Sequence, residues 1–160
     1  MESNINEVID FVKQYTKALD KGIDNGIKEL TKIAYEIVRK YCDNENLSNH
    51  LDNIQMDYDP ITKIGTVSTG DEVILFKEMG TGIVGSNNPH PNPTSNFSSW
   101  TYDVNNHGEA GWKYPKKDGT FGWTKGLPAG SMFYKTFNDI KKYADSTIQI
   151  EVRKTTKKIY

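Results

Sequence analysis

The feature that most limits how this chain can fold is the concentration of glycine, proline and tryptophan in one segment. Between Gly80 and Gly130 lie nine of the 13 glycines, five of the six prolines and all three tryptophans. Irregular segments of this length are uncommon inside a compact domain and are usually functional or disordered. The high aromatic content argues against disorder. We therefore expect an ordered insertion, pinned by aromatic side chains and carried on a small scaffold.

The insertion begins with Gly80-Thr81-Gly82-Ile83-Val84-Gly85, which matches the G-x-G-x-x-G pattern of dinucleotide-binding loops. That pattern holds a pyrophosphate only where a strand precedes the first glycine and the last glycine opens a helix. Here Pro89, Pro91 and Pro93 follow closely, and proline disfavours helix both at its own position and at the residue before it. We therefore interpret these glycines as turn residues and predict no nucleotide cofactor.

Charge and cysteine content narrow the class of protein. The chain has 160 residues and a formal net charge of −1 at pH 7, which gives no overall signal for nucleic-acid binding. Residues 141–160 are basic, which usually means a solvated terminus and otherwise a contact with an acidic partner or nucleic acid. Cys42 is the single cysteine and follows an apolar helical run, so we expect a buried structural thiol in a reducing compartment. No apolar run approaches about 18 residues, so we predict no membrane span.

Helical periodicity dominates the first 46 residues. One apolar stripe runs along residues 3–20 and another along residues 27–41, with Gly22 and Gly26 between them. We predict two helices separated at the glycines, the second capped by Asp24 or Asn25, with one long kinked helix as the alternative. Such helices are more often part of a core than partner-binding, so we expect a core role. The first stripe consists of Ile5, Val8, Ile9, Val12, Tyr15 and Leu19.

In the next segment, residues 47–79, we expect short extended elements over residues 47–70, followed by one more element. Alternating apolar residues from Ile54 to Tyr58, a turn at Asp59-Pro60 and a return from Ile64 to Ser68 predict a β-hairpin. Residues 71–79 carry acids at their start and a glycine just past their end, which favours a short helix. The same run also suits a buried strand, because so short a span does not separate the two periodicities.

Within residues 80–130, aromatic runs alternate with turn residues. Residues 100–104 alternate as a strand does, and Asp118-Gly119 between residues 112–114 and 121–124 is a strong hairpin signal. We therefore predict a two- or three-stranded aromatic β-ribbon. After it, Ser131 is a candidate cap for a helix.

The end of the chain is ambiguous after Asp145. Ile148, Ile150 and Val152 alternate as in a strand, and we favour a terminal strand over residues 146–156 that pairs with the predicted hairpin. The alternative is that the preceding helix continues.

No catalytic or metal-binding constellation stands out. His50, His90 and His107 lack the spacings of zinc ligands, and the chain has no G-x-S-x-G nucleophile. Glu78 and Asp103 lie in aromatic-rich sequence, as the carboxylates of a sugar cleft do, but the fold decides their separation. Aromatic loops are equally typical of protein interfaces. We therefore favour an interaction or assembly protein over a carbohydrate-binding module or an enzyme, and we predict no metal and no cofactor.

Three segments of the chain resemble three segments of one protein family, and they occur in the same order along the sequence. Leu75–Gly82 resembles the Y-V-E-F-G-T-G core of the "gene product ten" family of long-tailed phages, which are neck and tail-completion components. Trp100–Val104, Asn105–Glu109 and Gly111-Trp112 are similar to a Trp-x-Tyr-Asp-Val-Asn-Asn-His-Gly-Glu-x-Gly-Trp segment of its Firmicute-phage branch. Trp123–Tyr134 is similar to the Trp-Thr-Lys-Gly stretch and helix start that follow in that branch.

The resemblance implies an α+β fold in which N-terminal helices and a C-terminal helix pack on a small antiparallel sheet, with the long aromatic Gly/Pro-rich insertion. From the length and the lack of a dividing linker we predict one domain over residues 1–160: a helical part (1–46), a hairpin with a short helix (47–79), the insertion with its ribbon (80–130), and a helix with a terminal strand (131–160).

The resemblance also implies a function. The chain would be a structural virion protein of a phage or prophage, without catalysis or cofactor. It would form homo-oligomeric rings at the neck or tail end, act in head–tail joining or tail completion, and assemble in the bacterial host cytoplasm. Its partners would be copies of itself and tail-tube or head-connector proteins, not a membrane or specific nucleic-acid sequences. The alternative is a cell-wall carbohydrate-binding or hydrolytic module that uses the aromatic loop.

We expect one set of residues to order the insertion or to form the assembly interface. The set consists of Glu78, Gly80, Thr81, Gly82, Trp100, Trp112, Trp123 and Phe133.

Overall fold

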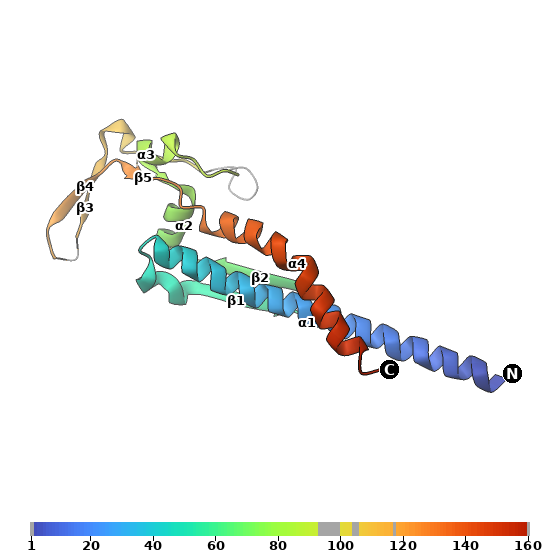
Figure 1. Cartoon of the computed structure of the whole chain (residues 1–160). Helices are drawn as coiled ribbons and strands as arrows, with labels where there is room; N and C mark the ends of the chain where they lie inside the picture. Colours follow the sequence, from blue (N-terminus) through green and yellow to red (C-terminus); the bar gives the residue numbers. More distant parts are fainter. Residues whose placement is uncertain (1, 93–99, 104–105, 117, 160) are drawn as a thin grey trace. The chain divides into compact units, whose positions relative to one another are not determined.

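The computed structural model describes residues 2–92, 100–103, 106–116 and 118–159 (Figure 1). It confirms the α+β class, with a long N-terminal helix, small antiparallel sheets and a C-terminal helix. The chain forms two compact units. We call residues 1–37, 55–68 and 137–160 the helix–hairpin unit, and residues 38–54 and 69–136 the insertion unit. The chain passes from one unit to the other within each of its two long helices.

The N-terminal region is one helix, α1 (Glu2–Asn44), so the prediction of two helices with the second capped at Asp24 or Asn25 is wrong, and the alternative of one long helix is correct. Gly22 and Gly26 do not interrupt it, because they serve a different purpose. A Cβ on Gly22 would lie 2.6 Å from the Cα of Val152, and one on Gly26 would lie 3.0 Å from the Cα of Ile148. The glycines therefore let two helix backbones approach closely.

The C-terminal region is also one helix, α4 (Met132–Thr156), so the terminal strand predicted over residues 146–156 is wrong. Ile148 and Val152 alternate in sequence as strand residues do, but they are also four apart and share one helix face. That face packs on the glycines of α1. Packing against another helix therefore overrides the weak strand preference of the β-branched residues.

Gly22→Ala tests this close contact, because helix propensity and packing predict opposite signs. Alanine is a better helix former than glycine by about 1 kcal/mol, yet its methyl group would collide with backbone atoms of α4. We expect the free energy of unfolding to fall by about 1–3 kcal/mol, measured by urea denaturation with far-ultraviolet circular dichroism. Asn6→Ala, on an exposed turn of the same helix, should leave stability unchanged or raise it. Equal stabilisation by both changes would contradict the contact.

The predicted hairpin is confirmed as β1 (Ile54–Asp59) and β2 (Ile64–Thr69). Its turn is organised by the Asp59 carboxylate, which accepts hydrogen bonds from the Ile61 amide at 2.8 Å and the Thr62 hydroxyl at 2.7 Å. Asp24 accepts hydrogen bonds from Tyr58 and Lys28. The hairpin is therefore tied to the middle of α1. Residues 48–53, expected to be extended, form a short 3₁₀ helix, η1 (Ser48–Asn53).

In the insertion unit, the predicted short helix is confirmed as α2 (Glu72–Met79). The Asp71 carboxylate caps it by accepting from the Val73 and Ile74 amides. Burial alone would raise the pKa of this carboxyl, but hydrogen bonds from His50, Ile74, Asn53 and Val73 together lower the pKa to about 2. Another short helix, α3 (Gly82–Asn87), begins at the second glycine of the G-x-G-x-x-G stretch and ends before the prolines, so the interpretation of Gly82 and Gly85 as turn residues is wrong. A helix, not a strand, precedes the first glycine, so the context that phosphate binding requires does not occur.

The predicted aromatic ribbon is confirmed as β3 (Trp112–Pro115) paired antiparallel with β4 (Phe121–Thr124). The strand expected at residues 100–104 is wrong for residues 100–103, and residue 104 lies outside the described residues. The additional strand is β5 (Gly126–Leu127), which forms antiparallel bridges with Thr81 and Gly82. The single-turn 3₁₀ helix η2 (Gly108–Ala110) precedes the ribbon.

The most deeply buried side chains lie in the insertion unit. Cys42 is among them, as predicted, and burial together with the charges of Glu78 and Glu45 raises the pKa of its thiol to about 12. The core role expected for the N-terminal stripe is wrong over its first turns, because every residue from Asn4 to Gln14 is exposed. The fully buried side chains are Val38, Cys42, Ile74, Met79 and Met132.

Candidate functional site

Glu78 lies at the centre of the insertion unit and is 6% exposed. Its Oε2 accepts a hydrogen bond from the Phe133 amide at 3.0 Å, and its Oε1 accepts one from the Tyr134 amide at 3.2 Å. These are the second and third amides of α4, the two that a capping side chain normally satisfies. Ser131, the predicted cap, sits at the capping position with a φ of 54°, but the acceptor atoms come from Glu78. A glutamate on α2 therefore caps α4 from a distance in sequence, and its negative charge also suits the positive end of that helix.

His90 completes the surroundings of Glu78. Its Nε2 lies 3.0 Å from Oε1 of Glu78, and its Nδ1 lies 3.0 Å from the backbone nitrogen of Asn92, which can only donate. Nδ1 therefore carries a lone pair, and the proton is on Nε2, which donates to the carboxylate. The ring of His90, 7% exposed, meets the ring of Tyr134 edge-on with centroids 5.4 Å apart. The pair is a neutral imidazole on a carboxylate, and it fixes the start of the Pro-rich segment to α2 and α4.

The Gly80-Thr81-Gly82 stretch makes the closest backbone contacts of the insertion. A Cβ on Gly82 would lie 2.3 Å from the carbonyl oxygen of Lys125, and a Cβ on Gly126 would lie 1.8 Å from that of Thr81. Gly80, Gly82 and Gly126 all have positive φ. The Thr81 hydroxyl accepts a hydrogen bond from the Leu127 amide at 3.2 Å. The two segments cross so closely that side chains do not fit between them, which is why glycine is required.

Trp100 holds the insertion to this crossing. Its indole nitrogen donates to the carbonyl of Gly80 at 3.2 Å, and its ring packs on that of Phe76 at 6.1 Å between centroids. Nearby, the carbonyl of Tyr102 accepts a hydrogen bond from the Gly82 amide at 2.6 Å. Trp100 is therefore an internal anchor.

Trp112 orders the start of the ribbon. Its half-buried ring stacks on His107 with centroids 5.2 Å apart and an interplanar angle of 16°. His107 in turn is held by Asp103, whose Oδ1 accepts from the amides of His107 at 2.6 Å and Gly108 at 3.0 Å. Asp103 thus forms the turn that precedes Trp112.

Trp123 behaves differently from the other two tryptophans, because it faces outward. The register pairs Lys113 with Trp123 and Pro115 with Phe121, so these four residues share one face of the ribbon. Trp123 is 58% exposed and Phe121 is 69% exposed. We call this surface the ribbon face. On the opposite face, the Tyr114 ring covers Gly122, where a Cβ would come within 2.5 Å of the ring.

The structure therefore divides the predicted residues into two groups. Glu78, Gly80, Thr81, Gly82, Trp100 and the backbone of Phe133 meet around the start of α4. Trp112 and Trp123 lie on the ribbon, on opposite faces. Sequence reasoning missed His90 as the partner of Glu78, although it noted that residue, and it missed the exposure of Phe121. The alternation Phe121-Gly122-Trp123 was the one sequence feature that indicated that Phe121 and Trp123 lie on the same face of the ribbon.

The carboxylates in this region hold backbone groups in place. The two carboxylates considered for a sugar cleft, Glu78 and Asp103, both accept backbone hydrogen bonds. Over the described residues, no three His, Cys, Asp or Glu side chains lie close enough together to hold a metal ion.

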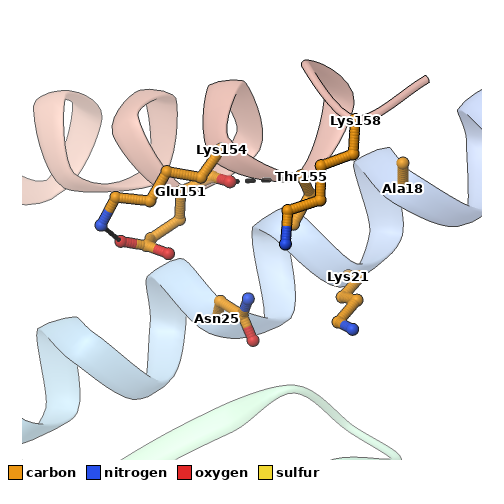
Figure 2. Close-up of a pocket in the computed structure, with 7 residues that line it drawn as sticks. All are labelled: Ala18, Lys21, Asn25, Glu151, Lys154, Thr155 and Lys158. Atoms are coloured by element: carbon orange, nitrogen blue, oxygen red, sulfur yellow. Dashed lines mark hydrogen bonds and ion pairs between the residues drawn. The ribbon is translucent and has the colours of Figure 1, made fainter. Parts of the chain in front are cut away.

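A separate groove of about 610 Å³ lies in the helix–hairpin unit between α1 and α4 (Figure 2). Lys154 pairs with Glu151 there, whereas Lys21 and Lys158 form no ion pair among the described residues. The groove is therefore polar and carries an excess of positive charge. Its lining residues are Ala18, Lys21, Asn25, Glu151, Lys154, Thr155 and Lys158.

Comparisons with protein-family models, with curated proteins and with solved structures give no significant match. Among the described helices, none combines the length and the apolar character needed to cross a membrane.

Proposed function

We propose that this protein is a structural subunit of a long-tailed phage or prophage particle, located at the neck or tail end. It forms a ring with copies of itself and contacts a tail-tube or head-connector protein. It acts in head–tail joining or tail completion and carries out no catalysis. The proposal starts from the family resemblance of residues 75–134 and gains support from how those residues are used.

The ribbon face is the observation that carries the proposal. Phe121 and Trp123 are large apolar side chains left exposed on a ribbon whose base is held by backbone contacts. Exposed aromatic residues on a rigid support are typical of protein interfaces. A ring subunit needs such preformed surfaces, because each copy contacts its neighbours and the next ring along the particle.

The use of Glu78 supports the non-catalytic part of the proposal. Both of its oxygens accept hydrogen bonds from the start of α4, and His90 donates to one of them. A general acid or base has to exchange its proton with substrate, and this carboxylate is occupied in holding two helices and a loop together. Asp103 is similarly occupied in a turn.

Deletion of the gene from a producing strain tests the proposal directly. Electron microscopy of the resulting particles should show filled heads separate from tails, or tails of uncontrolled length. The type of defect would separate a head-side neck protein from a tail-end protein. Normal, joined particles would overturn the proposed role.

A pair of tryptophan variants tests the ribbon face. Trp123→Ala removes an exposed ring, so we expect stability within about 0.5 kcal/mol of wild type but a loss of joined particles by about tenfold or more. Trp100→Ala removes an internal anchor, so we expect the free energy of unfolding to fall by about 2–3 kcal/mol. Denaturation and complementation of the deletion strain measure the two effects. A Trp123→Ala protein that is both stable and fully active would contradict an interface at this face.

The ribbon face also favours one other function, because two aromatic rings two residues apart on a strand could stack on sugar rings. A cell-wall carbohydrate-binding module would then be the function, with the hydrolytic version disfavoured by the occupied carboxylates. This alternative predicts that the purified protein binds peptidoglycan or its oligosaccharides and that Trp123→Ala abolishes the binding. No binding by the wild-type protein would rule it out.

A further inference from the structure

The first turns of α1 expose an apolar surface that the described residues of the helix–hairpin unit do not cover. Ile5, Val8, Ile9, Phe11 and Val12 are 60%, 61%, 44%, 42% and 54% exposed. Figure 1 shows these turns of α1, in blue, extending past the end of α4. A short helix gains little stability from its own hydrogen bonds in water, and most helices depend on packing of their apolar face. Among the described residues of the helix–hairpin unit, no other element packs on this part of α1, although Phe11 stacks on Tyr15 of the same helix.

The charge pattern of the same segment shows how wide the uncharged surface is. That surface is exposed over its first turns and half-buried at Tyr15, Ala18 and Leu19. At about 100° per residue, ten of the twelve uncharged positions between Asn4 and Leu19 fall on one continuous half of the helix circumference, and the other two, Asn6 and Gln14, fall outside it. All charged residues of this segment, Glu7, Asp10, Lys13 and Lys17, fall on the other half. We call the uncharged half the neutral face. It consists of Asn4, Ile5, Val8, Ile9, Phe11, Val12, Tyr15, Thr16, Ala18 and Leu19.

The neutral face is continuous with a surface that the chain already uses for helix packing. Gly22 and Gly26 lie on the same side of α1, and there α4 covers them through Val152 and Ile148. Helix α4 ends at Thr156. The apolar side of α1 therefore packs on α4 over its middle turns, whereas over its first turns, from Asn4 to Gln14, the described part of the chain leaves it exposed.

We propose that the neutral face is a self-association surface, on which the first turns of α1 from several copies of this chain pack together as a helical bundle. A two-stranded coiled coil needs only a narrow seam, whereas an apolar half-circumference suits a helix with neighbours on two sides. We therefore infer bundles of three or more copies. That a second copy of the chain covers this face rests on the proposed ring-forming function. The exposure of the face is observed independently of that proposal.

The composition of the face fits a copy of itself. A surface that packs on its own equivalents must not place like charges opposite one another, and the neutral face has no charge at all. A strongly charged partner would find no complementary group on it. In a closed ring every subunit supplies the same helix twice, to one neighbour on each side, which matches the width of the face.

Val12→Lys and Gln14→Lys form a matched pair for the test in the full-length protein. Both put a lysine on an exposed turn of α1, the first inside the neutral face and the second outside it. Lysine forms helices better than valine, so Val12→Lys should keep the helix, which circular dichroism checks. Sedimentation velocity over a concentration series measures the association.

We expect wild type and Gln14→Lys to sediment as trimers or larger assemblies, and Val12→Lys to associate at least about tenfold more weakly, because it would bury an unpaired charge. A wild-type protein that stays monomeric or dimeric throughout would overturn the proposal, as would equal effects of the two variants. These outcomes are separate from the particle-assembly test. If the wild-type protein is monomeric but gene deletion causes a head–tail joining defect, the proposed phage role is supported and only self-association through the neutral face is contradicted. If the deletion strain makes normal particles but the protein self-associates as expected, the phage role is contradicted and self-association through the neutral face is supported.

Discussion

Glu78→Ala should lower the free energy of unfolding of the insertion unit by about 3–5 kcal/mol, among the largest effects of any single change in this chain. The substitution removes the acceptors of the Phe133 and Tyr134 amides and the partner of the buried His90 ring at the same time. Each buried donor left unsatisfied costs about 1–3 kcal/mol. Tryptophan fluorescence during urea denaturation measures the change, because all three tryptophans lie in the insertion unit.

Two further variants make the Glu78 prediction specific. Glu78→Gln keeps the shape and one acceptor oxygen, so we expect an intermediate loss of about 1–3 kcal/mol and a protein that still folds. Glu72→Gln changes an exposed carboxylate at the start of the same helix and should cost no more than about 0.5–1 kcal/mol, through the helix dipole alone. Equal losses for Glu72→Gln and Glu78→Gln would contradict the capping role of Glu78.

Gly126→Ala is the second change with a large expected effect, about 3 kcal/mol or more. The added methyl would lie 1.8 Å from the carbonyl oxygen of Thr81 and 2.4 Å from its carbonyl carbon. Both are backbone atoms, so the clash can be relieved only by separating β5 from the residues it bridges. The φ of 106° at this position adds strain for any residue with a side chain.

Gly119→Ala is the matched control for Gly126→Ala. Gly119 also has a positive φ, 80°, but a Cβ there would meet nothing within 4 Å. We expect a cost of only about 1–2 kcal/mol, from the left-handed backbone conformation alone. The difference between the two glycine variants, measured by the same denaturation, isolates the steric part. A Gly126→Ala protein no less stable than Gly119→Ala would show that the two segments do not cross in contact.

Local signals gave the elements that the structure confirms. Asp71 before an apolar run and Gly80 after it predicted α2, and Asp118-Gly119 between aromatic runs predicted the β3–β4 ribbon. In both cases the deciding information lies within a few residues, because a cap or a tight turn is satisfied by its own neighbours. The hairpin of β1 and β2 was predictable for the same reason.

Long-range contacts decided what the sequence left open or predicted wrongly. From the sequence, Gly22 and Gly26 were interpreted as helix breakers. In the structure they make room for the backbone of α4, which lies more than 100 residues away in the chain and could not be inferred locally. The strand expected at residues 146–156 failed for the same reason, because its β-branched residues pack on those glycines. The exposure of the N-terminal stripe was equally hidden, since an amphipathic pattern does not reveal what covers it.

The candidate site shows the same division. By itself, the sequence determined that the glycines after α2 do not follow a strand and open a long helix as in a nucleotide-binding loop, and that aromatic residues contribute to the order of the insertion. Only the tertiary structure decided what each does: Glu78 caps α4, Trp100 anchors the crossing, and Trp123 faces outward with Phe121. The physical reason is that a residue's type limits which bonds it can make, while its partners and its exposure are set by segments that the fold brings to it from elsewhere in the chain.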